Sequence, residues 1–291
     1  MRRSLFVLTV VAALLALVVV PVAAITNGTP DGTDHPYVGL VVFHDEDGVP
    51  LWRCSGALLS ETVFLTAGHC VEPPAAAAVL WFDPGYPTPI PRGNLPTTPG
   101  TSCAGYTGYP CTGDATGVPH VNPDYCASPC GNGLPGFALR DVGVVTLDSP
   151  VVMPEYAELP QAGLVDTLEN KTGVDFVGYG VQDQLQIPGS LLPKPPPFYR
   201  WAGLRTRYYA PSELVSGNFV HSSEFIKLAL NPGGGSGGLC FGDSGGPDLL
   251  GSTDTVLAVN SYVTSYNCTG VGYSSRVDIP DVLSWIQSFM D

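Results

Sequence analysis

The residue with the clearest chemical potential is Ser244, which lies inside the hexapeptide GDSGGP at 242–247. A serine hydroxyl is a poor nucleophile at neutral pH, so acyl transfer needs a base within hydrogen-bond reach and donors directed at the developing oxyanion. Glycines around the serine allow unusual dihedrals and a close approach of the backbone to a substrate carbonyl. An ordinary glycine-serine turn is the alternative interpretation. The motif favours nucleophilic catalysis if a base is present elsewhere in the chain.

A candidate base is His69, which closes an apolar run in the sequence LTAGHC. Many histidines are surface or satisfied core residues, but here Cys54 and Cys70 stand on either side of the run and could staple the loop that presents the imidazole. A candidate acidic partner is Asp141, which heads the apolar run VGVVTL. Its alternative role is that of a turn cap. A nucleophile, a base and an acid are thus all present.

The order histidine, aspartate, serine, in the contexts TAGHC, an aspartate before an apolar run, and GDSGGP, resembles the chymotrypsin/trypsin family of serine proteases. The resemblance implies that Ser244 attacks the scissile carbonyl, that His69 accepts its proton and returns it to the leaving amine, and that Asp141 fixes the imidazole tautomer. The N–H groups of Gly242 and Ser244 would form the oxyanion hole. The implied activity is a serine endopeptidase that forms an acyl-enzyme with protein or peptide substrates. Chain order excludes α/β-hydrolases and subtilisins.

The same resemblance predicts an activation step. In this family a freed N-terminal Ile or Val inserts its ammonium beside the aspartate that precedes the nucleophile. Here Ile25 directly follows the small residue Ala24, so we expect removal of residues 1–24 to create an ammonium that pairs with Asp243. An unpaired buried aspartate would be costly, so the two groups depend on each other. The alternative is that a branched apolar residue follows Ala24 by chance.

Substrate selection in this family depends on the residue six positions before the nucleophile, which is Gly238 here and aspartate in trypsin-like enzymes. The segment beginning at Asn260, with Ser261, Tyr262 and Val263, resembles the strand that pairs with the substrate backbone by β-augmentation. Val263 stands where glycine is commoner among the open pockets of the family. We therefore predict that small or medium apolar residues precede the scissile bond.

The N-terminal segment predicts secretion. Arg2 and Arg3 precede the apolar run Leu5–Val20, and a small-residue site ends at Ala24, which is typical of a signal peptide rather than a membrane anchor. Two of the 12 Lys and Arg residues leave with this signal, so the mature chain carries 10 basic against 26 acidic residues, a net charge of −16. This charge excludes nucleic acid and anionic membranes as partners, since both need a basic face. We expect a secreted monomer without cofactor or metal.

All eight cysteines follow the signal, and an even number in an oxidising compartment predicts disulfides. The resemblance implies a bridge between Cys240 and Cys268 that joins the nucleophile loop to the specificity strand. Residues 83–138 form a proline- and glycine-rich insertion that we predict to be a long loop. Its four cysteines could pair locally, as Cys103 with Cys111 and Cys126 with Cys130, although three connectivities are possible. Zinc is the disfavoured alternative for these four. The insertion either overhangs the cleft or is a surface decoration.

Short β-type runs separated by glycine and proline predict an all-β protein, and no alternating βα units are present. The predicted strands are Tyr37–His44, Ser55–Leu59, Thr62–Thr66, Val79–Phe82, Val142–Leu147, Val174–Val177 and Val256–Tyr262. One helix is predicted at 280–289, opened by a proline. The family resemblance implies that residues 25–291 form one domain of two six-stranded antiparallel β-barrels of the chymotrypsin type, followed by this helix.

Two further functions are compatible with the same fold. A catalytically silent binding protein is one, because a fold does not guarantee an activity. A serine hydrolase that acts on esters is the other, because the same groups permit it. The presence of all three triad residues together with the glycines of the nucleophile loop favours an active endopeptidase.

Overall fold

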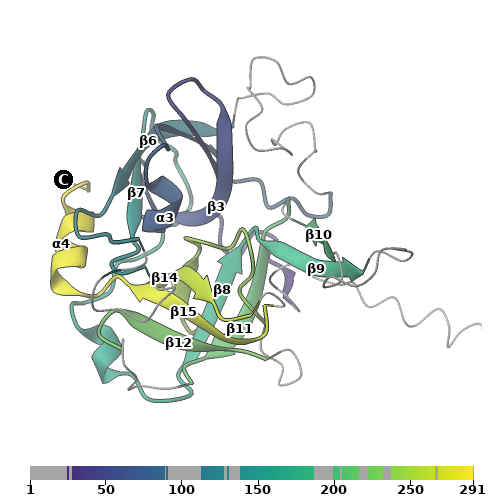
Figure 1. Cartoon of the computed structure of the whole chain (residues 1–291), viewed down its shortest axis with the longest axis vertical. Coiled ribbons are helices and arrows are strands. Elements are labelled where there is room, and N and C mark those ends of the chain that lie inside the picture. The colour runs from purple at the N-terminus through teal and green to yellow at the C-terminus, as the bar shows by residue number, and fades with distance from the viewer. Residues whose placement is uncertain are drawn as a thin grey trace, which may run out of the picture.

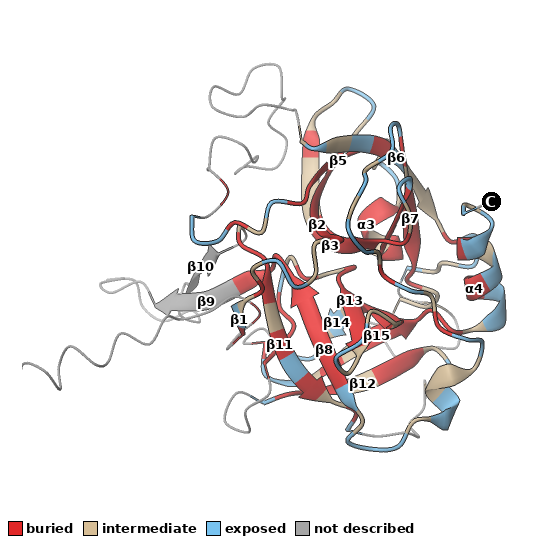
Figure 2. Ribbon diagram, turned by 180° about the vertical axis from the view of Figure 1, so that it is seen from behind, coloured by how far each residue is buried: buried red, intermediate tan, exposed pale blue. Residues whose placement is uncertain are grey.

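The computed structural model describes residues 25, 28–88, 90, 113–127, 130, 138–186, 199–203, 205–215, 222–231, 237–265 and 268–290, and at 182–186 and 199–203 it describes the backbone alone. The signal segment 1–24 lies outside the described residues, as do Cys103 and Cys111, so those predictions stay predictions. Strands dominate the described chain and form two halves that lie side by side (Figure 1). Buried residues are concentrated on the strands of both halves (Figure 2). The predicted all-β class is confirmed.

The first half is a closed six-stranded antiparallel barrel in the order β2-β3-β4-β7-β6-β5. Its strands are β2 (Val38–His44), β3 (Pro50–Leu58), β4 (Val63–Thr66), β5 (Ala77–Trp81), β6 (Ala115–Val121) and β7 (Gly143–Leu147). Every residue of β2 is buried, because this strand pairs with β3 on one side and with β5 on the other. This half matches the first barrel that the resemblance implied.

The strand β6 lies within residues 83–138, where the sequence predicted a loop throughout, so the prediction was wrong for this stretch. The strand contains Pro119, which has no N–H to donate and is therefore confined to positions where a donor is not required. Its pairing with β5 ends at Gly117, two residues before the proline, while its pairing with β7 runs from Gly117 to Val121. The proline in this segment therefore obscured, at the level of sequence, the strand β6 that closes the barrel.

The second half is a seven-stranded antiparallel sheet in the order β1-β11-β8-β13-β14-β15-β12. Its strands are β1 (Thr29–Pro30), β8 (Gly173–Gly178), β11 (Tyr208–Glu213), β12 (Phe225–Leu230), β13 (Pro247–Leu250), β14 (Val256–Val263) and β15 (Gly270–Arg276). This differs from the expected second closed barrel of six strands. The short strand β1 occupies the free edge of β11 at Tyr208 and Tyr209. In the described chain β11 meets β12 only near its end, through an isolated bridge between Leu214 and Leu228 and the hydrogen bonds from Ser212 Oγ to Ala229 O and from Val215 N–H to Lys227 O.

The remaining elements lie outside these two sheets. They are the hairpin of β9 (Val181–Gln186) and β10 (Tyr199–Gly203), and the helices α3 (Gly68–Val71), η3 (Leu164–Thr167) and α4 (Pro280–Gln287). The predicted C-terminal helix is confirmed as α4, although it ends two residues earlier than expected. Among the residues that the structure describes, none of the helices is long and apolar enough to cross a membrane.

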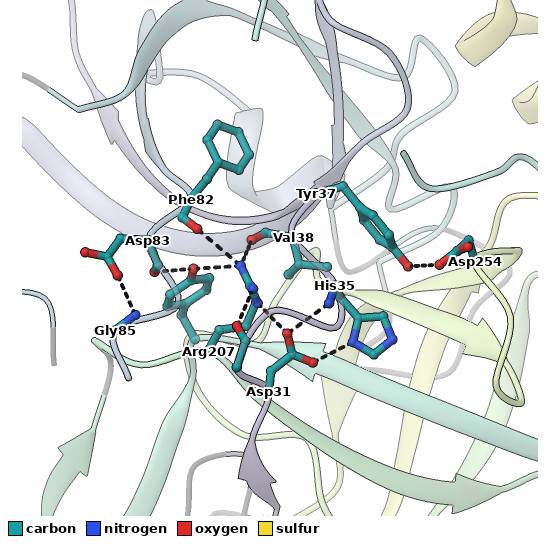
Figure 3. Close-up of polar contacts among 11 residues, drawn as sticks. Asp31, His35, Tyr37, Val38, Phe82, Asp83, Gly85, Arg207 and Asp254 are labelled. Carbon is teal, nitrogen blue, oxygen red and sulfur yellow. Dashed lines mark hydrogen bonds and ion pairs between the residues drawn. The ribbon is translucent and has the colours of Figure 1, made fainter. Parts of the chain in front are cut away.

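A buried guanidinium joins the two halves (Figure 3). Arg207 directly precedes β11 of the second half, and its Nη1 donates to the carbonyl oxygens of Val38 and Phe82 in the first half at 3.1 and 3.2 Å. Its Nε donates to Asp31 at 2.6 Å, and Asp31 also contacts the ring of His35. A buried charge persists only when it is paired and hydrogen-bonded, and this one has both kinds of partner. The network fixes the relative position of the strands that carry the site.

Candidate active site

Pairing of β4 with β7 brings His69 and Asp141 together, although they stand 72 residues apart in the chain. His69 lies in α3, directly after β4, and Asp141 directly precedes the apolar run of β7. Its Oδ2 lies 2.8 Å from the imidazole Nδ1, and its Oδ1 accepts the backbone N–H of His69 at 2.7 Å. Gly68 permits this approach, because a Cβ there would stand 3.1 Å from Asp141 Oδ1 and 2.8 Å from the ring of Tyr125. The carboxylate therefore holds both the ring and the backbone of the histidine.

Ser261 of β14 holds the carboxylate from the other half of the molecule. Its hydroxyl donates to Asp141 Oδ2 at 2.5 Å. Burial raises the pKa of Asp141, but the charge and hydrogen bonds of His69 and the Ser261 hydroxyl outweigh it, and the pKa is lowered. Burial lowers the pKa of His69, but the charge and hydrogen bond of Asp141 outweigh it, and the pKa is raised. This arrangement favours an ionised carboxylate beside an imidazole that can accept a proton.

The nucleophile loop approaches the histidine from the C-terminal half of the chain. The carbonyl oxygen of Ser244 accepts the N–H of Ser55 at 2.8 Å, and Cys70 Sγ lies 3.9 Å from the same oxygen. Cys70 follows His69 in α3 and is bonded to Cys54 of β3, as expected for the staple of this loop. Ser244 thus lies beside the turn that carries the candidate base. Within the described chain no hydrogen bond joins the Ser244 hydroxyl to the imidazole.

Two backbone N–H groups next to the nucleophile have no acceptor. Neither Gly242 nor Ser244 donates its N–H to another residue in the described part of the chain. The peptide before Gly242 is held by its carbonyl, because Phe241 O accepts the N–H of Val181 at 2.8 Å. Gly242 has φ 95°, a value that favours glycine over any other residue. A pair of unpartnered donors beside a serine hydroxyl is what an oxyanion hole requires.

Asp243 lies beneath the nucleophile loop and is fully buried. Its carboxylate accepts the backbone N–H groups of Gly180 at 2.7 Å and Cys240 at 3.0 Å. Burial raises the pKa of Asp243 to about 7, and these two hydrogen bonds only partly oppose the effect. A Cβ on Gly180 would stand 2.2 Å from the carboxylate, so the turn over Asp243 requires glycine at this position. Among the described residues this side chain is held by backbone amides alone.

Ile25, the expected partner of Asp243, packs elsewhere in the described chain. It is fully buried in the apolar cluster of the second half, together with residues such as Phe176 and Leu257. No interaction joins Ile25 to Asp243 among the described residues, and in this intact chain the nitrogen of Ile25 is an amide rather than an ammonium. The predicted activation pair therefore stays a prediction about the cleaved chain.

A cavity of about 350 Å³ opens beside the candidate nucleophile. Three of the four predicted substrate-binding residues line it with Ser244, namely Ser261, Tyr262 and Val263. Gly238, the fourth, is buried and does not belong to the lining. Asn260, which begins the predicted substrate-pairing segment, also lines the cavity, and sequence reasoning did not assign the further lining residues Leu239, Cys240, Phe241, Thr264 and Ser265 to substrate binding. These residues could have been found from the sequence, because they directly precede the nucleophile motif or directly follow the predicted substrate-pairing segment.

Cys240, which lines this cavity, forms a disulfide with Cys268, as the resemblance implied. The bond between Cys126 and Cys130 is also formed, which matches one of the local pairings considered for the insertion. Cys54, His69 and Cys70 place potential ligand atoms within 4.8 Å of one another. These two cysteines are joined in a disulfide and carry no thiolate, so the group does not have the donors that a metal site of this kind needs.

Comparison with known proteins agrees with this geometry. No family model matches the chain. A phenoloxidase-activating enzyme of Bombyx mori is 26% identical over 298 residues, which cover 92% of this chain and 60% of that protein. The chain thus spans about 60% of the length of this curated relative. The solved structure of HL collagenase is 17% identical, with TM-score 0.61 over 91% of this chain and 97% of that one. Human heparin binding protein is 17% identical, with TM-score 0.56 over 90% and 95%. In its architecture this chain therefore has the chymotrypsin-like fold of these solved structures.

Proposed function

We propose that the mature chain is a secreted serine endopeptidase that uses Ser244 as nucleophile, His69 as general base and Asp141 as the group that orients the imidazole. The Ser244 hydroxyl attacks the scissile carbonyl, and its proton passes to His69 and then to the leaving amine. Water then hydrolyses the acyl-enzyme by the same route in reverse. The N–H groups of Gly242 and Ser244 stabilise the oxyanion in both tetrahedral intermediates.

The observation that carries this proposal is the contact between His69 Nδ1 and Asp141 Oδ2 at 2.8 Å, next to two unpartnered backbone donors in the nucleophile loop. The carboxylate fixes the tautomer that leaves Nε2 free to accept a proton. The missing hydrogen bond from Ser244 to the imidazole is compatible with this role, because catalytic hydrogen bonds in unliganded sites often tighten only when substrate binds.

The activation step remains part of the proposal. Cleavage after Ala24 would release the ammonium of Ile25, and its insertion beside Asp243 would give a charged partner to a buried carboxyl that, within the described residues, only two backbone amides support. Secretion is supported by the signal-like segment 1–24 and by the disulfides of the described chain. N-terminal sequencing of the secreted active protein should give Ile25 as the first residue, and any other start would reject signal removal as the activating cut.

Protein or peptide chains are the proposed substrates. The segment Ser261–Val263 lines the cavity beside Ser244 and could pair with an extended substrate backbone. Val263 lines this cavity, and a branched side chain where glycine is commoner in the open pockets of the family would narrow its mouth and favour small or medium apolar side chains before the scissile bond. A cleavage profile on a peptide library tests this, and strict cleavage after Arg or Lys would contradict it.

The central experiment combines labelling with digestion. The secreted protein is treated with a fluorophosphonate probe, the adduct is located by peptide mapping, and casein cleavage is measured. We expect a single adduct on Ser244 and loss of both label and proteolysis in Ser244→Ala, while Ser252→Ala, which removes an exposed hydroxyl, behaves as the parent. Absence of the label would favour a silent binding protein. Labelling without cleavage of casein or peptides would favour an esterase, and either result rejects the proposal.

A further inference from the structure

Asn260 makes three hydrogen bonds to the nucleophile loop. Its backbone N–H donates to Gly246 O at 3.0 Å, and its carbonyl accepts the N–H of Gly245 at 2.8 Å. Its side-chain Nδ2 donates to the carbonyl oxygen of Asp243 at 3.1 Å. The residue is 2% exposed, so water does not compete for the hydrogen bond of this side-chain amide. One residue of β14 thus holds the peptides on both sides of Ser244.

The orientation of the Asn260 amide follows from its two neighbours. The hydroxyl of Ser274 on β15 donates to Oδ1 at 3.4 Å, and the cross-strand register places Ser274 directly opposite Asn260. The Asp243 carbonyl oxygen, on the other side, can only accept. Exchanging Oδ1 and Nδ2 would set two acceptors against each other, so the assigned orientation is the one that satisfies both contacts.

The Asp243 carbonyl and the Ser244 N–H belong to one peptide group. This peptide is planar and trans, so its C=O and N–H point in opposite directions. The carbonyl accepts Asn260 Nδ2 and also the N–H of Gly246 at 2.9 Å, and both donors lie on the side of the loop that faces β14. Holding the oxygen inward therefore directs the Ser244 N–H outward, where it has no acceptor in the described chain.

We propose that Asn260 is a positioning residue for the oxyanion hole, which sets the direction of the Ser244 N–H by fixing the Asp243 carbonyl through its buried side-chain amide. This role rests on the proposed acyl-transfer function. The Gly242 donor needs no such support from Asn260, because the Phe241 carbonyl is held separately by the N–H of Val181. The two donors of the hole are thus fixed from two different directions.

The kinetic test is Asn260→Leu, which removes the donor and keeps a similar side-chain volume. Losing one oxyanion donor typically lowers kcat by about 10²- to 10³-fold, and a donor that is only misdirected should cost less, roughly 10-fold or more. KM should stay within about twofold, because the contact acts on the transition state rather than on ground-state binding. Ser212→Ala is the matched control: it removes another buried hydrogen bond of the same half, to Ala229 O at 2.7 Å, far along β11 from the loop.

A second variant and a structural measurement complete the test. Ser274→Ala leaves the amide of Asn260 in place but removes its partner on the Oδ1 side, so we expect kcat to fall by about threefold with KM unchanged. Crystal structures of Asn260→Leu and of the parent should show that the peptide between Asp243 and Ser244 rotates only in the variant. This comparison does not depend on enzymatic activity. It therefore tests whether Asn260 orients the peptide before Ser244 even if the labelling experiment rejects the proposed function.

Three outcomes would overturn the positioning role. The first is a peptide between Asp243 and Ser244 that keeps its parental orientation in Asn260→Leu. The second is a parental kcat in both Asn260→Leu and Ser274→Ala. An equal loss of kcat in Ser212→Ala, in step with melting temperature, would show general destabilisation instead.

Discussion

Ser261 Oγ lies 2.5 Å from Asp141 Oδ2, the same carboxylate oxygen that contacts the ring of His69. The serine comes from β14 of the second half and the other two residues from the first, so this contact spans both halves of the molecule. It immediately follows Asn260, which holds the nucleophile loop. Two adjacent residues of one strand therefore connect Asp141 to the peptide that precedes Ser244.

Removing the Ser261 hydroxyl should weaken the orientation of the imidazole. A hydrogen bond to a charged group contributes about 1.5–3 kcal/mol, so we expect Ser261→Ala to lower kcat/KM by about 10-fold or more. The remaining contact with His69 should keep the triad assembled, and casein cleavage should persist at the reduced rate. Parental kcat/KM in Ser261→Ala would contradict a contribution of this hydroxyl to catalysis.

The raised pKa of His69 predicts the pH dependence of activity. The base must be unprotonated to accept the proton of Ser244, so kcat/KM should fall as the pH drops through the His69 pKa. Because Asp141 raises that pKa above its ordinary value of 6.5, the midpoint of the profile should lie above 6.5. Asp141→Asn should lower the rate by about 10⁴-fold, as for other triads of this type, and shift the midpoint downward. An acid optimum for the parent would be incompatible with His69 as base.

Asp243 predicts different stability profiles for cleaved and uncleaved chains. A carboxyl whose folded pKa is raised to about 7 gives the most stability below its unfolded value near 3.8, and the stability declines as the pH rises towards 7. For an unpaired Asp243 the decline is of the order of 4 kcal/mol. A chain that begins at Ala24 should show it, and one that begins at Ile25 should not, because the ammonium stabilises the ionised form. Urea unfolding between pH 4.5 and 8, in Ser244→Ala forms, measures the difference, and identical profiles would argue against the ion pair.

Asp248 predicts a stabilising substitution. It is fully buried on β13, no hydrogen bond of normal geometry reaches either of its carboxyl oxygens in the described chain, and burial raises its pKa well above the ordinary value although the nearby Ser274 hydroxyl partly opposes the shift. Leaving such a group unsatisfied costs about 1–3 kcal/mol, so Asp248→Val should increase the free energy of unfolding by a similar amount. The gain should be larger at pH 8 than at pH 5, because ionisation adds to the cost. Asp47→Val, at an exposed position, should give no gain. A destabilised Asp248→Val protein would mean that the carboxyl has a stabilising role.

The strands that the sequence predicted are those with continuous apolar runs, and each of them overlaps an observed strand. Several of the strands that it missed have mixed composition, such as β13 with the sequence PDLL and β15 with GVGYSSR, although β12, with the largely apolar sequence FIKLAL, was missed as well. Such strands form because neighbouring strands supply hydrogen-bond partners and an apolar side, which are properties of the sheet rather than of the segment.

The sequence by itself determined the proposed chemistry: Ser244, His69 and Asp141 could be proposed as the triad because nucleophilic catalysis restricts the residue types and their immediate neighbours. It also identified the cysteines that staple the site. Only the tertiary structure decided which groups support them. The contacts of Ser261 with Asp141 and of Asn260 with Asp243 join residues 120 and 17 positions apart. Hydrogen bonds between separate strands leave no periodic or local pattern in a sequence, because their partners meet only after the sheets have formed.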